Sequence, residues 1–129
     1  MRSAILGIGH YVPTKVVTND DLAKLMPTTD EWIQQRTGIK QRRFIEQSGI
    51  GASDLAVPAV HMALERAGKR VEDIDMIIFA TLSPDVFFPG SGCFLQTKLG
   101  LKGIPALDIR NQCSGFLYGL SIADAWIRT

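Results

Sequence analysis

The chain has 129 residues, of which 46% are hydrophobic and 21% are charged, and its formal net charge is +1. A chain this close to neutrality has no overall field that would attract nucleic acid or a membrane surface, so we expect neither as a partner. Its length allows one modest hydrophobic core, which predicts a single folding unit over residues 1–129. Two cysteines without close pairing and no secretory leader are typical of a reducing interior, so we expect a cytoplasmic protein.

The first part of the chain predicts four short elements, two strands and two helices. Each helix is expected to begin at a threonine followed by acidic residues and to stop at a proline or a glycine. We expect a strand over residues 4–8, helices from Thr18 to Pro27 and from Thr29 to Gly38, and an exposed strand over residues 39–45.

The remainder of the chain has a more regular pattern. Continuous apolar runs predict strands buried on both faces, and amphipathic runs predict helices. We expect helices over residues 53–67, 91–99 and 114–127, and strands over residues 76–81 and 104–109. This alternation with short connections predicts an α/β fold with a mostly parallel sheet packed by helices. Along the last helix, the expected apolar face consists of Phe116, Leu120, Ala123 and Ile127.

Cys113 is the leading candidate for a catalytic residue, because it lies where the last predicted strand gives way to the last predicted helix. Unpaired backbone N–H groups at a helix start favour the thiolate form of a nearby cysteine, and they are able to hold an oxyanion. Ser114 and Gly115 keep the approach to the sulfur small and open. These features predict a nucleophile, whereas the alternative for any lone cysteine is a small buried hydrophobe.

Other motifs leave alternatives open. Trp32 and Arg36 lie four residues apart on one predicted helix, so they share a face that suits the stacking of a nucleobase. The alternative is an aromatic residue that anchors a short helix to the core. A local basic run comprises Arg36, Lys40, Arg42 and Arg43. It is suited to bind phosphates or an acidic partner, and the alternative is an exposed strand with solvated charges. Cys93, His10 and His61 are scattered and give no metal-site spacing, so no metal is expected.

Taken together, several segments resemble the N-terminal part of the β-ketoacyl-[acyl-carrier-protein] synthases III, within the thiolase-like condensing enzymes. The matching pieces follow the family's order across essentially the whole chain. They are residues 28–33 (Thr-Thr-Asp-Glu-Trp-Ile), residues 36–39 (Arg-Thr-Gly-Ile), Arg42, Phe88 with Pro89, and residues 111–116 (Asn-Gln-Cys-Ser-Gly-Phe). The resemblance implies the N-terminal half of a thiolase-like α/β fold.

The resemblance also implies a role for each matching residue. Cys113 would accept an acyl group from a coenzyme A thioester, which is a substrate, so no separate cofactor is expected. Trp32 would stack on the adenine of the coenzyme, with Thr28 and Arg36 helping to position the nucleotide. Phe88 would reach across a homodimer to shape the acyl pocket of the other subunit. Malonyl carried on acyl carrier protein would then lose carbon dioxide and attack the acyl-cysteine, giving a β-ketoacyl chain that starts fatty-acid or polyketide synthesis.

Two departures from the family pattern bear on this function. Asn111 and Gln112 precede Cys113, where the family usually has small residues, and this leaves the acyl-chain specificity and the subfamily open. The family's catalytic histidine and asparagine belong to a C-terminal half, and the last helix reaches Thr129 without a stop signal, so we expect a truncated chain that is inactive by itself. The alternatives are acyl transfer to another acceptor, or a non-catalytic fragment that binds coenzyme A or forms a dimer.

Overall fold

The computed structural model describes residues 2–129 and confirms the predicted α/β class. Backbone contacts divide the chain into two compact units, whereas the sequence predicts one. The first unit is formed by Met1–Tyr11 and Gly51–Thr129, and the second by the intervening Val12–Ile50. Within the described residues, no helix is both long and apolar enough to cross a membrane.

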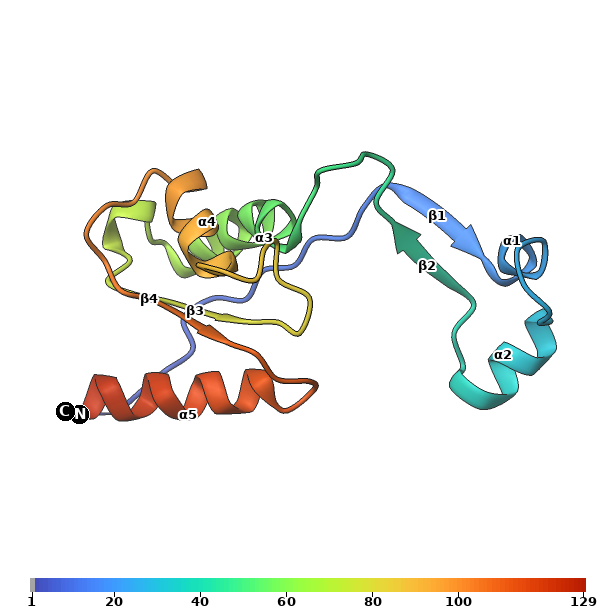
Figure 1. Cartoon of the computed structure of the whole chain (residues 1–129). Helices are drawn as coiled ribbons and strands as arrows, with labels where there is room; N and C mark the ends of the chain where they lie inside the picture. The colour runs from blue at the N-terminus through green and yellow to red at the C-terminus, as the bar shows by residue number, and fades with distance from the viewer. Residues whose placement is uncertain (1) are drawn as a thin grey trace. The chain divides into compact units, whose positions relative to one another are not determined.

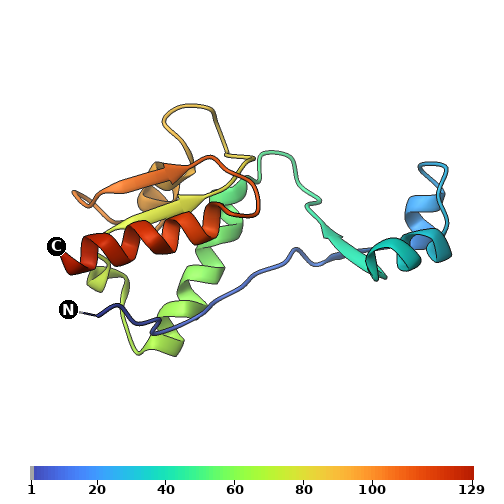
Figure 2. The ribbon, with the colours of Figure 1, turned by 90° about the horizontal axis from the view of Figure 1, so that it is seen from below.

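The first unit holds a two-stranded parallel sheet with helices on both faces (Figure 1). Its elements are α3 (Ala52–Ala67), η1 (Val71–Asp73), β3 (Ile77–Ala80), α4 (Ser91–Lys98), β4 (Ala106–Ile109) and α5 (Gly115–Arg128). Helix α4 packs against both strands and α3 packs against α4, while α5 packs against β3 from the other side (Figure 2). The order strand, helix, strand, helix therefore agrees with the prediction.

Two glycines bring α5 close to the sheet. Gly115 and Gly119 are buried, and a Cβ on Gly119 would lie 3.4 Å from Ile78 Cγ2. The apolar face predicted for this helix is therefore not its buried face: Phe116 keeps 65% and Ile127 keeps 47% of its surface exposed. These side chains line an open groove of about 760 Å³ along α5 and β3. The four residues thus share one face, as predicted, while small residues of the helix make its closest contact with a strand.

Residues 4–8 do not form the strand that the sequence predicts. The segment has no strand partner among the described residues and its backbone lies against α3 instead. A Cβ on Gly9 would overlap the carbonyl oxygen of Ala59, so glycine is required for this approach. Arg66 Nη1 donates a hydrogen bond to Ile8 O over 2.8 Å. An apolar run marks an extended segment, whereas a strand also needs a neighbour to pair with.

The second unit contains β1 (Lys15–Thr18), α1 (Asn19–Ala23), α2 (Asp30–Thr37) and β2 (Gln41–Phe44). Strand β1, which the sequence analysis missed, pairs antiparallel with β2 along its whole length. Both helix starts are confirmed: Thr18 Oγ1 accepts a hydrogen bond from Asp21 N, and Thr29 Oγ1 accepts one from Trp32 N over 3.1 Å. Gly38 ends α2 with a φ of 71°, the left-handed conformation that glycine adopts without strain.

A buried amide joins these elements. Asn19 is 1% exposed. Its Nδ2 donates hydrogen bonds to Asp30 Oδ1 and to Ile39 O, each over 2.8 Å. Arg42 Nη2 donates a hydrogen bond of 2.6 Å to Asn19 Oδ1. All the polar groups of this amide side chain are thus engaged, and they fix the position of α2 relative to β1 and β2.

The cap of α2 supports a prediction, because this helix carries Trp32. Replacing Thr29 with alanine removes the acceptor of the Trp32 N–H, and we expect a loss of about 1 kcal/mol in the free energy of unfolding. Thr29→Ser keeps the hydroxyl and should retain most of the stability. Urea unfolding of both variants followed by far-UV circular dichroism measures the difference. Equal destabilisation by serine and alanine would contradict a role for the hydroxyl as a cap.

Candidate functional site

Cys113 is exposed on the turn that joins β4 to α5. Gly115 N donates a hydrogen bond of 2.9 Å to Gln112 O, which closes this turn around the cysteine. Asn111 Oδ1 accepts a hydrogen bond from Gln112 N over 2.8 Å, so the two residues that depart from the family pattern are used to shape the turn. The structure therefore places the thiol at the strand-to-helix joint, as predicted, with open access for a reagent.

The start of α5 is suited to hold negative charge next to this thiol. Ser114 is the N-cap residue, but its side chain makes no capping hydrogen bond. The first-turn N–H groups of a helix have no partner within the helix and carry its partial positive charge. Because Gly115 N already donates to Gln112 O, the other N–H groups of the first turn are the ones available to stabilise negative charge near the thiol.

Phe88 lies on the loop that follows β3, and this loop is close to the turn that carries Cys113. Strands β3 and β4 are parallel, so the loop after Ala80 and the turn after Ile109 leave the sheet at the same edge. Arg110 connects the two: its guanidinium lies 4.6 Å from the centre of the Phe87 ring and donates a hydrogen bond to Phe87 O. Phe88 is 89% exposed, which leaves its ring free to contact another molecule.

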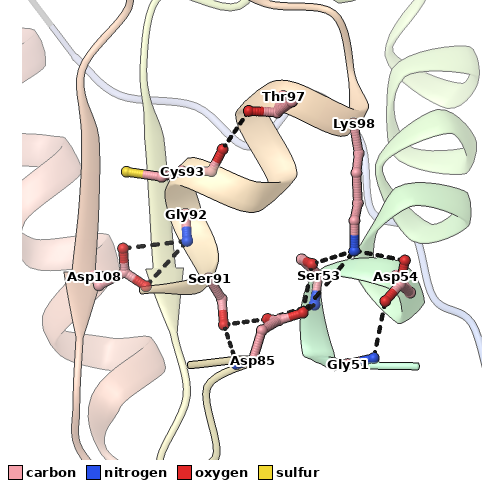
Figure 3. A network of polar contacts seen from close by, with 10 residues as sticks. All are labelled: Gly51, Ser53, Asp54, Asp85, Ser91, Gly92, Cys93, Thr97, Lys98 and Asp108. Atoms are coloured by element: carbon pink, nitrogen blue, oxygen red, sulfur yellow. Dashed lines mark hydrogen bonds and ion pairs between the residues drawn. The ribbon is translucent and has the colours of Figure 1, made fainter. Parts of the chain in front are cut away.

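A half-buried carboxylate fixes the start of this loop (Figure 3). Asp85 Oδ1 accepts a hydrogen bond of 2.6 Å from Ser53 Oγ, and Asp85 Oδ2 accepts one of 2.5 Å from Ser91 Oγ. Ser53 N also donates to this carboxylate, at 3.1 Å from Oδ2. Both serines are 0% exposed and lie at the starts of α3 and α4. One carboxylate thus joins two helix starts to the loop.

Hydrogen bonds keep the Asp85 carboxyl group ionised. Burial acts to raise the pKa of Asp85, but the hydrogen bonds from Ser53 and Ser91 outweigh it, so the pKa lies below its usual range. Lys98 Nζ lies 4.0 Å from Asp85 Oδ1 and 2.5 Å from Asp54 Oδ1. The ammonium of Lys98, followed by Gly51 N–H, also holds the pKa of Asp54 below its usual range.

A second aspartate fixes the end of the loop. Asp108, on β4, accepts hydrogen bonds from Gly92 N at 3.0 Å from Oδ1 and 3.2 Å from Oδ2. Gly90 has a φ of 115°, and the Asp108 carboxylate occupies the space that a side chain at this position would need. Sequence reasoning missed Asp85, Asp108 and Arg110, because their partners are distant in the chain. The available sequence signal for the Asp85 contacts was that a serine, Ser53 or Ser91, lies at the start of each of two predicted helices.

The other residues singled out by the sequence come together in the second unit. Arg36 lies over the Trp32 ring, with its guanidinium carbon 4.7 Å from the ring centre. The indole is 54% exposed, so it is not the core anchor that was the alternative. Met26, Pro27, Thr28, Thr29 and Trp32 line a cavity of about 580 Å³. Thr28 Oγ1 is buried and has no hydrogen-bond partner among the described residues, so it is a polar group that a ligand could satisfy.

The arginines of the basic run make different contacts in the structure. Arg36 stacks on Trp32 and Arg42 binds Asn19, while Arg43 Nη1 donates a hydrogen bond of 3.0 Å to Thr14 O. Two of these guanidinium groups therefore hold β1 and β2 together, and they are not free phosphate ligands. Within residues 2–129, no group of histidine, cysteine, aspartate and glutamate side chains is placed to hold a metal ion. Cys93 lies half-buried on α4.

Comparison with known proteins gives a consistent result. No family model matches the chain. The chain is 52% identical over 128 residues to a β-ketoacyl-[acyl-carrier-protein] synthase III of Ehrlichia canis, a match that covers 99% of this chain and 40% of that protein. It is 50% identical over 129 residues to a protein of the same name from Caldanaerobacter subterraneus, covering 100% of this chain and 39% of that protein. The chain thus spans about 40% of the length of these curated relatives.

Solved structures agree. The crystal structure of 3-oxoacyl-[acyl-carrier-protein] synthase III from Aquifex aeolicus superposes with a TM-score of 0.88 and 46% sequence identity. This match covers 96% of the present chain and 40% of that chain. The likeness confirms the thiolase-like fold expected from the sequence.

The Asp85 contacts generate a prediction with a defined pH dependence. Asp85→Asn removes the charge that two hydroxyl groups and a backbone N–H stabilise, and we expect a loss of about 2 kcal/mol in unfolding free energy at pH 7. The folded-state pKa is lowered, so the stabilisation is present above the unfolded pKa of about 4 and is lost as the pH falls below it. Urea titrations from pH 7 to pH 3 should therefore show the two proteins converging in acid.

The matched control is Asp75→Asn, which alters an exposed aspartate of the same unit. It should change stability little at any pH. A constant gap between Asp85→Asn and the unchanged protein across this range would contradict a stabilising carboxylate.

Proposed function

Because the chain is homologous along its whole length to part of the β-ketoacyl-[acyl-carrier-protein] synthases III, we propose that it supplies the acyl-accepting nucleophile and the coenzyme A site of such a condensing enzyme. The substrate is an acyl-coenzyme A, and the acyl group passes to Cys113. The observation that carries the proposal is the exposed thiol on the uncapped turn before α5.

The first half-reaction requires the sulfur and the helix start. The Cys113 thiolate attacks the thioester carbonyl carbon, and negative charge develops on the carbonyl oxygen, next to the first-turn N–H groups of α5. When the tetrahedral intermediate collapses, the bond to the coenzyme's sulfur breaks and coenzyme A leaves as its thiolate. The product is an acyl-cysteine thioester, so one difficult condensation is divided into two easier steps.

The second half-reaction uses a different partner. Malonyl held on acyl carrier protein loses carbon dioxide, and the resulting carbanion attacks the acyl carbon and expels the Cys113 thiolate. His10 and His61 are exposed and lie far from Cys113 in the sequence. We therefore assign the groups that promote decarboxylation to the portion of the relatives' length that this chain does not span.

The enzyme is proposed to act as a cytoplasmic homodimer in which Phe88 contributes to the acyl pocket of the other subunit.

The second unit is proposed to hold the nucleotide of coenzyme A. The exposed Trp32 ring offers a flat surface for the adenine, and Arg36 places a positive charge next to it for the phosphates. The Thr28 hydroxyl has no hydrogen-bond partner among residues 2–129, and a bound ligand would provide one. The adjoining cavity of about 580 Å³ is of the size that small-molecule sites commonly have.

Acylation of Cys113 is the direct test. The native protein is incubated with acetyl-coenzyme A, and its intact mass and peptide masses are measured. We expect one acetyl group on the peptide that contains Cys113, no adduct in Cys113→Ala, and an unchanged adduct in the control Cys93→Ala. Coenzyme A binding without any adduct on Cys113 would overturn the catalytic assignment and favour a non-catalytic binding module.

Coenzyme A affinity tests the second unit. Trp32→Ala should weaken binding by a factor of about 10, because stacking contributes about 1–3 kcal/mol per base. Thr28→Val keeps the shape but removes the hydroxyl, and should weaken binding by a factor of about 5 if the ligand satisfies that group. Calorimetric titration with coenzyme A measures both. The control is Trp126→Ala, since Trp126 is equally exposed (54%) but belongs to the first unit. Unchanged affinity in Trp32→Ala would refute this site.

A further inference from the structure

The carboxamide of Asn111 contacts the backbone of the turn that carries Cys113. Its Oδ1 accepts a hydrogen bond of 2.8 Å from Gln112 N. A Cβ on Gly115 would lie 3.4 Å from Asn111 Cβ, so this half-buried side chain also lies against the start of α5. Alanine, one of the small residues that are usual before the cysteine in the family, has no acceptor for this N–H. The contact is therefore a feature of the present sequence.

Hydrogen bonds fix the backbone of Gln112 on both of its sides. Its N–H is held by Asn111 Oδ1, and its carbonyl oxygen accepts a hydrogen bond of 2.9 Å from Gly115 N. The peptide planes before and after Gln112 thus have one partner each, and planar peptide units leave only two soft dihedral angles between them. Without the Asn111 carboxamide, the Gly115 contact alone would hold this residue.

This arrangement sets the direction of the Cys113 N–H. The peptide bond between Gln112 and Cys113 is trans, so its N–H points opposite to its C=O. Because Gln112 O faces Gly115 N at the start of α5, the Cys113 N–H points away from Gly115. Within residues 2–129 this N–H donates no hydrogen bond. A free donor of defined direction therefore belongs to the same residue as the sulfur.

The direction of this donor matters for one kind of reaction and not for another. When the thiolate attacks a carbonyl carbon, the sulfur–carbon bond forms and an electron pair moves to the carbonyl oxygen, which becomes an oxyanion. A donor that is already oriented stabilises this charge without reorganising during the reaction. Alkylation of the same thiolate by an alkyl halide releases halide and forms no oxyanion. A loss of orientation should therefore slow acylation only.

We propose that Asn111 is a positioning residue that, by holding the Gln112 N–H, keeps the Cys113 N–H directed at the carbonyl oxygen of the acyl donor. The inference rests on the proposed function for the identity of this donor as a coenzyme A thioester. Asn111 acts through the backbone of Gln112 and does not touch the substrate. The departure from the family pattern at this position is thus assigned to the acylation step.

The experiment compares acylation with alkylation of Cys113 in the native protein. p-Nitrophenyl acetate acylates a thiolate through an oxyanion without using the coenzyme A site, iodoacetamide alkylates it, and peptide masses give each rate separately from Cys93. Both reactions consume the thiolate, so their ratio does not depend on the ionised fraction. In Asn111→Ala and in Asn111→Leu, which is similar in size but lacks the acceptor, this acylation-to-alkylation ratio should fall by a factor of about 5. The control Lys102→Ala, at an exposed residue of the same unit, should leave the ratio unchanged.

Parallel rates with acetyl-coenzyme A separate this inference from the proposed function. If the thioester leaves Cys113 unmodified but the ratio with p-nitrophenyl acetate falls in both Asn111 variants, the proposed function fails and the positioning role stands. If acetyl-coenzyme A acylates Cys113 and both variants keep the ratio of the natural protein, the positioning role is overturned.

Two further results would overturn the positioning role. An equal fall in acylation and alkylation means a loss of thiolate or of access to the sulfur, rather than of an oriented donor. A fall in Asn111→Ala that Asn111→Leu does not share means that the volume of the side chain matters, and not its hydrogen bond to Gln112 N.

Discussion

The arrangement of the first unit depends on the carboxylate of Asp85. It accepts hydrogen bonds from Ser53 and Ser91, whose side chains are fully buried at the starts of two helices. A partly buried carboxylate is stabilised where donors and positive charge compensate it, and Lys98 supplies the charge from the end of α4. This single group therefore couples α3, α4 and the loop after β3, and each of the three would lose a partner if it were removed.

The register of β4 adds a second constraint. Asp108 contacts Gly92 at the end of the loop that follows β3, Arg110 contacts Phe87 within this loop, and Cys113 follows β4 on the next turn. Because successive side chains of a strand point to opposite faces, a shift of β4 by one residue would turn Asp108 away from Gly92. The pairing of Ala106 with Ile77 thus sets the position of the loop and of the nucleophile together. The position of Cys113, and with it the proposed chemistry, therefore depends on the pairing of β3 with β4.

Parts of both candidate sites could be predicted because they rest on short-range regularities. The helical repeat places Arg36 over Trp32, and the joint between an apolar run and an amphipathic run marks Cys113. The unsatisfied Thr28 hydroxyl was not predictable from these regularities, since burial without a partner depends on how the surrounding residues pack. The resemblance to a family identified Thr28, whereas the structure supplies an independent physical reason to expect a ligand there.

The sequence by itself determined where the helices begin to within a residue, the parallel strand pair and the location of the candidate nucleophile, because capping, periodicity and turn chemistry act over a few neighbouring residues. It did not determine every helix end, since α1 stops at Ala23 rather than at Pro27. Only the tertiary structure decided which face of α5 is buried, that residues 4–8 lie on α3 without a strand partner, and that Arg110 holds Phe87. These outcomes depend on close approach between segments that are far apart in the chain. A sequence pattern indicates which side chains a segment can bury and which hydrogen bonds it can donate. Tertiary packing alone determines which other segment is the partner.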